Sequence, residues 1–291
     1  MQPLAEVFGF PVDNVSDAAN RHRKNRLCPY NNRVPNCTKD KANEPLGVCS
    51  IFDTSGEIAI TCPVRFRQDW VIAENAASFF FPDHTWTSLS EVRLNDRDGV
   101  SAGNIDIVLV AYAAGGHIID FGALEVQAVY VSGNVRQPFE RYLRDTPAYL
   151  ADAQLSNTTL RPRADYLSSS RKRLVPQLIY KGSILKAWNK KQAVALHKNF
   201  FATLPLLEQV PAEAADMAWL IYDLQRDLEH NIYRLTLTQM VYTQFKPALD
   251  QITTPVPGEM TEFLGRLQGK LDEKRDEENT PPDAFSLDQL L

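Results

Sequence analysis

Residues 121–134 read FGALEVQAVYVSGN, and this stretch decides how the middle of the chain is interpreted. Its apolar and β-branched residues predict a buried strand that ends in a Ser-Gly-Asn turn. Glu125 and Gln127 interrupt the apolar run, and residues two apart in a strand point to the same face. The sequence therefore predicts a strand that directs a carboxylate and an amide to one place.

A second carboxylate interrupts the preceding apolar stretch. Asp106 lies in GNIDIVLVAY, nineteen residues before Glu125, and Glu91 lies further upstream in SLSEVRLND. Buried carboxylates on neighbouring strands repel each other unless a cation binds them, and Mg²⁺ prefers such oxygen ligands. Because such an ion stabilises charge on a phosphate and activates water, the pattern D-x18-E-x-Q indicates phosphodiester hydrolysis. The alternative is that both acids point to solvent from one face of an edge sheet.

The composition is that of an ordinary globular protein. The chain has 291 residues, of which 44% are hydrophobic and 23% charged, with a net charge of −5. This length allows one large domain or two modest ones. No apolar stretch is long enough to predict a membrane span, and the N-terminus lacks the pattern of a secretory signal. We therefore expect a cytoplasmic protein without a membrane partner. The negative net charge is a weak argument against a polyanionic partner, because a sum hides a basic face.

The cysteines are confined to the first 62 residues, at Cys28, Cys37, Cys49 and Cys62. In a reducing compartment such clustering favours a metal site over disulfides. Four thiolates favour tetrahedral Zn²⁺ or Fe in a closed site that leaves no position for chemistry. The spacing does not match the paired C-x2-C pattern, so free or buried thiols without a metal are the alternative.

Residues 161–191 form a basic stretch, with nine Lys and Arg residues against one acid, Asp165. The stretch also contains three consecutive serines and three aromatic residues. Lys and Arg neutralise phosphates, and Arg reads guanine in the major groove. We therefore predict DNA contacts here, against the simpler alternative of a solvated charged face. The candidate residues are Arg161, Arg163, Ser168, Arg171, Lys172, Arg173 and Lys181.

Two segments after this stretch are predicted to be helical. Residues 192–204 indicate a short helix. Residues 212–250 contain a long amphipathic helical pattern around AADMAWLIYDLQRDLEHN, followed by YRLTLTQMVYTQF, which reads as either strand or helix. A further helix is expected near 258–275, followed by an acidic, solvated end at 272–278. The apolar stripe of the long pattern has helical spacing and is expected to be core: Met217, Leu220, Ile221, Leu224 and Leu228.

Several blocks together resemble one known family. FGFPVDN, CPYNNRVPNCTK, LGVCS, GNIDIVLV, ALEVQAVYVSGN and ADYLSSSRKRLVPQLIYKG resemble the NotI family of type II restriction endonucleases, over roughly residues 7–245. The resemblance implies an α/β fold with a PD-(D/E)XK nuclease core, a central mixed sheet flanked by helices. It also implies an N-terminal four-cysteine metal-binding module over residues 1–66 and a nuclease core with a helical C-terminal part over residues 67–291.

The same resemblance assigns roles residue by residue. The four cysteines would bind a structural iron or zinc ion, and Asp106 and Glu125 would hold the catalytic Mg²⁺. Gln127 would complete the catalytic set, with Glu91 as a possible accessory acid. The superfamily pattern has Lys where this chain has Gln127, although some restriction endonucleases also have Gln there. An amide does not titrate and cannot act as a general base, which leaves activity itself open.

The leading hypothesis is a homodimeric, Mg²⁺-dependent type II site-specific deoxyribonuclease of a prokaryotic cytoplasm. It would cut double-stranded DNA at a specific, GC-rich palindromic site and leave 5′-phosphate and 3′-hydroxyl ends. The first alternative is a catalytically inactive, sequence-specific DNA-binding protein with the same cysteine module. The second is a metal-stabilised interaction scaffold unrelated to DNA.

Overall fold

The computed structural model describes residues 2–31, 35–41, 44–151 and 161–276. The chain divides into two compact units, residues 1–253 and 254–291. In the second unit the described part is α10 (Met260–Asp276), which confirms the helix expected near 258–275. In none of these described ranges is a helix both long enough and apolar enough to cross a membrane.

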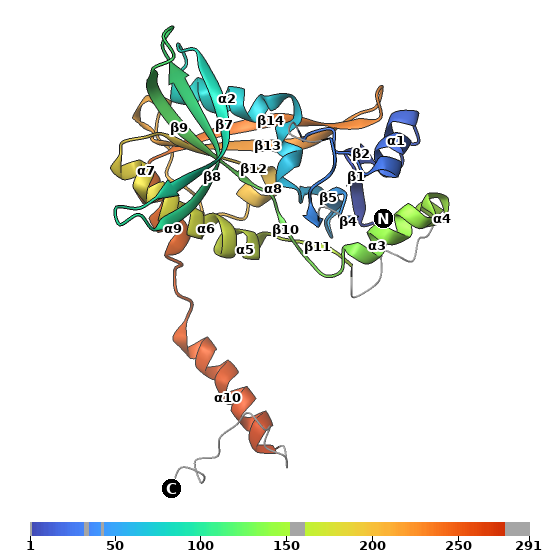
Figure 1. Cartoon of the computed structure of the whole chain (residues 1–291). Coiled ribbons are helices and arrows are strands. Elements are labelled where there is room, and N and C mark those ends of the chain that lie inside the picture. The colour runs from blue at the N-terminus through green and yellow to red at the C-terminus, as the bar shows by residue number, and fades with distance from the viewer. Residues whose placement is uncertain (1, 32–34, 42–43, 152–160, 277–291) are drawn as a thin grey trace. The chain divides into compact units, whose positions relative to one another are not determined.

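A mixed six-stranded sheet forms the centre of the first unit, with the order β14-β13-β12-β9-β8-β7 (Figure 1). Strands β7, β8 and β9 form an antiparallel meander, and β12 runs parallel to both β9 and β13. Strand β14 pairs antiparallel with β13. This confirms the expected α/β class with a central mixed sheet. The strands are β7 (Trp86–Asn95), β8 (Ser101–Tyr112), β9 (Ile118–Gln127), β12 (Gln192–His197), β13 (Met217–Asp227) and β14 (Ile232–Thr243).

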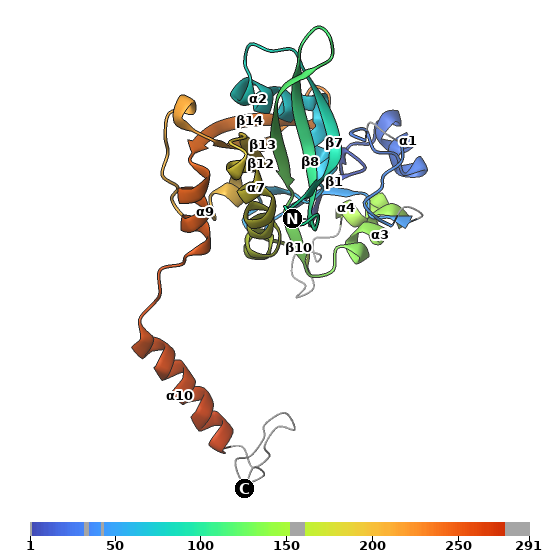
Figure 2. The same cartoon turned by 60° about the vertical axis from the view of Figure 1, so that its left-hand side comes forward.

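Helices cover both faces of this sheet (Figures 1 and 2). On one face, α2 (Val71–Phe80) packs its apolar side against Leu109, Leu124 and Val126. On the other face, Leu185 packs with Val108 and other apolar residues of the sheet. Leu185 belongs to a helical run over residues 166–187, named here the long helical run. Its segments are α5 (Tyr166–Ser169), η3 (Ser170–Leu174), α6 (Val175–Gln177), η4 (Leu178–Gly182) and α7 (Ser183–Ala187).

Side-chain alternation along β9 places the residues of interest. Leu124 and Val126 face α2, so Glu125 and Gln127 point to the face covered by the long helical run. Two turns of this run, η3 and η4, are π-helical, a distortion that is rare in helices and frequent at functional sites.

The cysteine-bearing part of the chain forms a smaller sheet with the order β2-β1-β5-β6. Its hairpin β5–β6 turns at Thr54-Ser55-Gly56, and Ser16 caps α1 with its hydroxyl oxygen. The remaining elements are β1 (Leu4–Val7), β2 (Phe10–Pro11), α1 (Asp17–Asn25), β3 (Asp40–Lys41), β4 (Glu44–Pro45), β5 (Val48–Phe52), β6 (Ile58–Ile60), η1 (Pro63–Trp70), β10 (Tyr130–Ser132), α3 (Arg136–Arg144), α4 (Thr146–Ala151), β11 (Arg163–Asp165), α8 (Lys198–Phe201), η5 (Ala212–Ala214) and α9 (Phe245–Thr253).

Two predictions of helix are wrong. The segment 192–204 is mainly strand β12 with a single helical turn, and the helix predicted around AADMAWLIYDLQRDLEHN is strand β13. The following YRLTLTQMVYTQF, left open between strand and helix, lies mainly in strand β14. Residues 217–222 are buried on both faces of the sheet, so all of them are apolar and a helical spacing can be read from them by chance. Leu228, the last member of the proposed stripe, lies beyond the strand and is 85% exposed.

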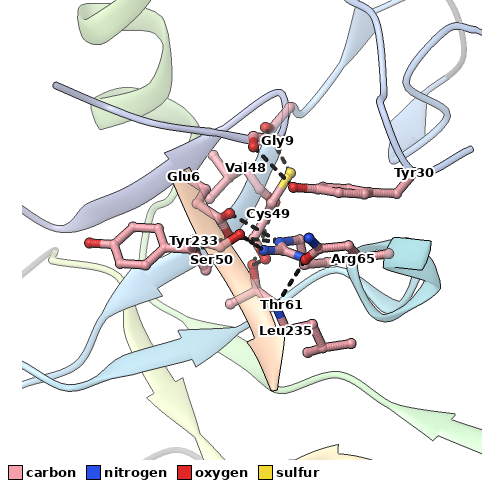
Figure 3. A network of polar contacts seen from close by, with 12 residues as sticks. Glu6, Gly9, Tyr30, Val48, Cys49, Ser50, Thr61, Arg65, Tyr233 and Leu235 are labelled. Atoms are coloured by element: carbon pink, nitrogen blue, oxygen red, sulfur yellow. Dashed lines mark hydrogen bonds and ion pairs between the residues drawn. The ribbon is translucent and has the colours of Figure 1, made fainter. Parts of the chain in front are cut away.

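A buried ion pair joins the cysteine-bearing sheet to the central sheet (Figure 3). Arg65 Nε donates to Glu6 Oε1 at 3.0 Å, and its Nη2 donates to the carbonyl oxygen of Tyr233 at 2.7 Å. Ser50 donates to the other oxygen of Glu6 at 2.7 Å, and the Arg65 guanidinium lies 4.4 Å from the ring centroid of Tyr30. Both charged side chains are fully buried. Arg65 therefore connects β1, β14 and the loop that carries Cys28.

Replacing Arg65 with Met should lower the free energy of unfolding by about 3–5 kcal/mol, because Glu6 is then buried without its partner. Denaturant unfolding followed by circular dichroism measures this. The control is Glu140→Gln, which removes an exposed pair of Arg136 within α3 and should change stability by about 0.5 kcal/mol or less. Equal effects of the two substitutions would contradict the role given to Arg65.

Candidate active site

The register of β8 and β9 places Asp106 beside Glu125. Ile107 pairs with Leu124 in the antiparallel ladder, so the next positions outward, Asp106 and Glu125, lie opposite each other. The regular ladder ends at this point, and the backbone N–H of Val126 donates instead to Asp106 Oδ2 at 2.8 Å. We refer to Asp106 and Glu125 as the acid pair. The two carboxyl groups therefore lie where the backbone hydrogen bonds between β8 and β9 stop.

Burial and mutual repulsion keep the acid pair from being fully ionised. Burial raises the pKa of Glu125 to about 8, the neighbouring Asp106 carboxylate adds to this rise, and Lys181 opposes it. Burial also raises the pKa of Asp106, although the hydrogen bond from Val126 acts against it. A bound cation would remove the repulsion and favour the ionised form of both groups.

One oxygen of Glu125 is satisfied and the other is not. Oε2 accepts a hydrogen bond from Lys181 Nζ at 2.6 Å. Oε1 is buried, and the described part of the chain supplies no hydrogen-bond partner for it. A buried carboxylate oxygen without a donor, next to a second carboxylate, is a suitable ligand set for a hard divalent cation. The acid pair therefore fits Mg²⁺ by its chemistry.

Gln127 and Glu91 lie on either side of the acid pair. The Gln127 side chain is buried and its amide Nε2 donates to Gln177 Oε1 of the long helical run. Glu91 has a left-handed backbone, with φ of 57°, at a position in β7 skipped by the ladder between Ser90 and Val92. Glu91 is exposed, and its charge contributes to the raised pKa of Asp106. All four residues of the predicted catalytic set thus lie on adjacent strands β7, β8 and β9.

A cavity of about 440 Å³ opens beside the acid pair. Asp106 and Gln127 line one side of it, and Lys172 and Arg173 of the long helical run line another. The Arg173 guanidinium lies over the ring of Tyr130, 5.3 Å from its centroid. Asp106 and Gln127 of the predicted catalytic set therefore share one cavity with Lys172 and Arg173 of the predicted DNA contacts.

The other predicted DNA contacts are distributed around the same helical run. Arg163 and Arg171 line a separate cavity of about 720 Å³ with Ser132 and Ser170. The Ser168 backbone N–H donates to Asp165 and so caps the first helical turn. Arg161 is half-buried, and Lys181 is buried against Glu125 rather than exposed with the other cations.

Sequence reasoning did not identify Gln177, and it predicted Lys181 as a DNA contact instead of a partner of Glu125. The available signal was their spacing: Gln177 and Lys181 are four residues apart, which puts them on one side of a helix.

The four cysteines lie in the smaller sheet and in the segments next to it, as free thiols. Burial raises the pKa of Cys28 to about 11, and the thiols of Cys62 and Cys37 add to this rise. Cys49 is fully buried, and its pKa is also raised by burial and then by Cys62. Across the described residues, no three His, Cys, Asp or Glu side chains stand close enough to hold a metal ion. The thiols are thus within electrostatic reach of one another without forming a preassembled metal centre.

Comparison with known proteins now adds an independent finding. The family model for restriction endonuclease NotI matches residues 7–235, which include the acid pair, Gln127, all four cysteines and the long helical run. No curated protein matches this sequence. Members of a restriction endonuclease family are nucleases that bind DNA. Because the match covers well over half of its length, this chain belongs to the NotI restriction endonuclease family.

Proposed function

We propose that this protein is a Mg²⁺-dependent type II restriction endonuclease that hydrolyses phosphodiesters of double-stranded DNA at a specific site. The observation that carries the proposal is the acid pair, two carboxyl groups on adjacent strands, of which Asp106 lines a cavity together with Lys172 and Arg173. The acidic residues suit a divalent cation and the basic residues suit a phosphate. One cavity therefore contains groups for both partners of phosphodiester hydrolysis.

Each side chain then has a role that its environment supports. Asp106 and Glu125 would hold Mg²⁺, which when bound stabilises charge on the phosphate and lowers the pKa of a water. Lys172 and Arg173 would bind the DNA phosphate and hold it in the cavity. Gln127 is held by Gln177 and orients groups at the floor of the site without accepting a proton. Glu91, exposed beside Asp106, would add to the negative field that attracts the cation.

The cysteines would have a structural role. We propose that Cys28, Cys37, Cys49 and Cys62 bind one zinc or iron ion, and that their loops close around it. The burial of the thiols and the influence of Cys62 on the pKa of Cys28 and of Cys49 support this proposal, because buried thiolates need a cation to remain ionised. The module over residues 1–66 would then support the nuclease core over residues 67–291, with Arg65 at their junction.

The target and assembly follow from family resemblance. We propose that this chain forms a homodimer that recognises a GC-rich palindrome. Cleavage would leave 5′-phosphate and 3′-hydroxyl ends. The alternative is a catalytically inactive sequence-specific DNA-binding protein. It is favoured by one observation: Gln127, where the superfamily pattern has Lys, is neutral and its amide is held by Gln177.

The substitution Asp106→Asn distinguishes these two functions. It keeps an acceptor for the Val126 N–H but removes one metal ligand, so cleavage of a GC-rich plasmid should fall by about 10³-fold or more. Gel-shift measurement in Ca²⁺ should find DNA binding retained. Asp98→Asn, in the exposed turn between β7 and β8, is the matched control and should leave cleavage unchanged. A wild type that binds specific DNA and never cuts it in Mg²⁺ would establish the inactive alternative.

The basic side of the cavity makes a separate prediction. Lys172→Ala and Arg173→Ala should each weaken DNA binding and reduce the slope of log K against log salt concentration by about 1, as for loss of one phosphate contact. Fluorescence anisotropy across a salt series measures the slope. Lys190→Ala removes a cation that is paired with Asp120 instead, and the slope should not change. If the Lys172→Ala and Arg173→Ala variants had the same slope as Lys190→Ala and the wild type, these two residues would be excluded as the phosphate site.

The cysteine proposal is tested by metal content. The purified protein should carry about one zinc or iron ion per chain by elemental analysis, and iron would give red thiolate-to-iron absorption. Cys37→Ser should lose this ion, and the melting temperature should fall by about 5 °C or more because a structural ion contributes several kcal/mol. A metal-free wild type whose melting temperature equals that of Cys37→Ser would show that the cysteines are merely buried thiols.

A further inference from the structure

A buried cation reaches the acid pair from the long helical run. Lys181 is 4% exposed, and its Nζ donates to Glu125 Oε2 at 2.6 Å and to the carbonyl oxygen of Asn104 at 2.7 Å. These two acceptors belong to β9 and β8, so one ammonium group bridges the two strands that carry the acid pair. Among the described residues, Lys181 is the only Lys or Arg that forms an ion pair with Asp106 or Glu125.

The spacing of the helix matches the spacing of the strand. Gln177 and Lys181 are four residues apart, about 6 Å along a helix. Glu125 and Gln127 are two apart, about 6.7 Å along a strand. Gln177 hydrogen-bonds to Gln127 and Lys181 to Glu125, so two side-chain contacts connect the helical run to β9. The π-helical turn η4 carries Lys181 and brings it to this position.

This arrangement fixes which oxygen of Glu125 is available. Oε2 is occupied by the ammonium group, and Oε1 is left buried without a hydrogen-bond partner from any described residue. A carboxylate held at one oxygen has only its other oxygen free for a cation. A partner of this kind, behind a ligand, orients it and sets the affinity of the metal site.

We propose that Lys181 is a positioning residue of the active site, which holds Glu125 by Oε2 so that Oε1 is presented to the cation beside Asp106. This inference rests on the proposed metal-dependent nuclease function and adds a residue to it. Gln127 is neutral, so the positive charge next to the acid pair comes from the long helical run instead of from β9. Lys181 acts through Glu125 and does not contact the DNA.

The test is direct Mn²⁺ binding by the full-length protein without DNA, measured by electron paramagnetic resonance. Glu125→Gln defines the background from any other site. Lys181→Met should weaken the Mn²⁺ affinity by about 10- to 100-fold, as expected for loss of a residue that supports a ligand. Lys181→Arg, which keeps a charged donor, should retain more of the affinity than Lys181→Met. Lys186→Met is the matched control, because Lys186 lies in the same helical run but is an exposed cation paired with Asp216. This variant should bind Mn²⁺ with wild-type affinity.

Cleavage kinetics give a second readout. The loss in Lys181→Met should appear as a higher Mg²⁺ requirement and should be partly recovered at high Mg²⁺, whereas a misfolded variant would not recover. If Lys181→Met does not fold by circular dichroism, Lys181→Gln carries the same test with a polar replacement.

Three results would overturn the proposal. If a folded Lys181→Met variant bound Mn²⁺ with wild-type affinity, Lys181 would have only a structural role beside Glu125. Tighter Mn²⁺ binding in that variant would mean that the ammonium group repels the cation more than it positions Glu125. In both cases the nuclease proposal survives, because wild type still binds Mn²⁺. A wild type without Mn²⁺ binding above the Glu125→Gln background would overturn both proposals together.

Discussion

The antiparallel pairing of β8 with β9 is the constraint on which the site depends. It forces Asp106 and Glu125 into opposition at the place where the ladder ends, with Glu125 buried. Two carboxyl groups so placed cannot both ionise without a compensating charge. Two hydrogen bonds stabilise the carboxyl groups: the backbone N–H of Val126 donates to Asp106, and Lys181 donates to Glu125. Glu125 Oε1 is left without a hydrogen bond, and it is the oxygen that we propose as a ligand of the metal ion.

The cysteine-bearing segment continues directly into a residue that lines the cavity beside Asp106. Cys62 precedes Pro63 directly, and Pro63 lines the cavity with Asp106 and Gln127. Two residues further, Arg65 is bound to Glu6 and to the carbonyl oxygen of Tyr233, so η1 is fixed to both sheets. An ion held by the thiolates would therefore order the wall of the cavity opposite the long helical run, far from the chemistry in sequence but adjacent in space.

Sequence alone predicted the local pattern of the site well and its partners poorly. The placement of Glu125 and Gln127 on one face follows from alternation in a strand, a rule that tertiary contacts rarely override. The sequence predicts a helix in place of strand β13 because residues 217–222, buried on both faces, carry no alternation of apolar and polar positions. The sequence predicts Lys181 as a DNA contact because it lies in the basic stretch 161–191. Its burial depends on a π-helical turn and on Asn104 and Glu125, which are remote in sequence, so the local signal is limited to its four-residue spacing from Gln177.

The central claim is that the acid pair binds one divalent cation at a DNA phosphate. The most direct measurement is anomalous diffraction from a crystal of the protein with specific DNA and Mn²⁺. The account predicts an anomalous peak that is ligated by Asp106 and by Glu125 Oε1 and that lies against a phosphate oxygen. A well-ordered complex with no peak between these two carboxylates, or with the peak at other residues, would contradict it.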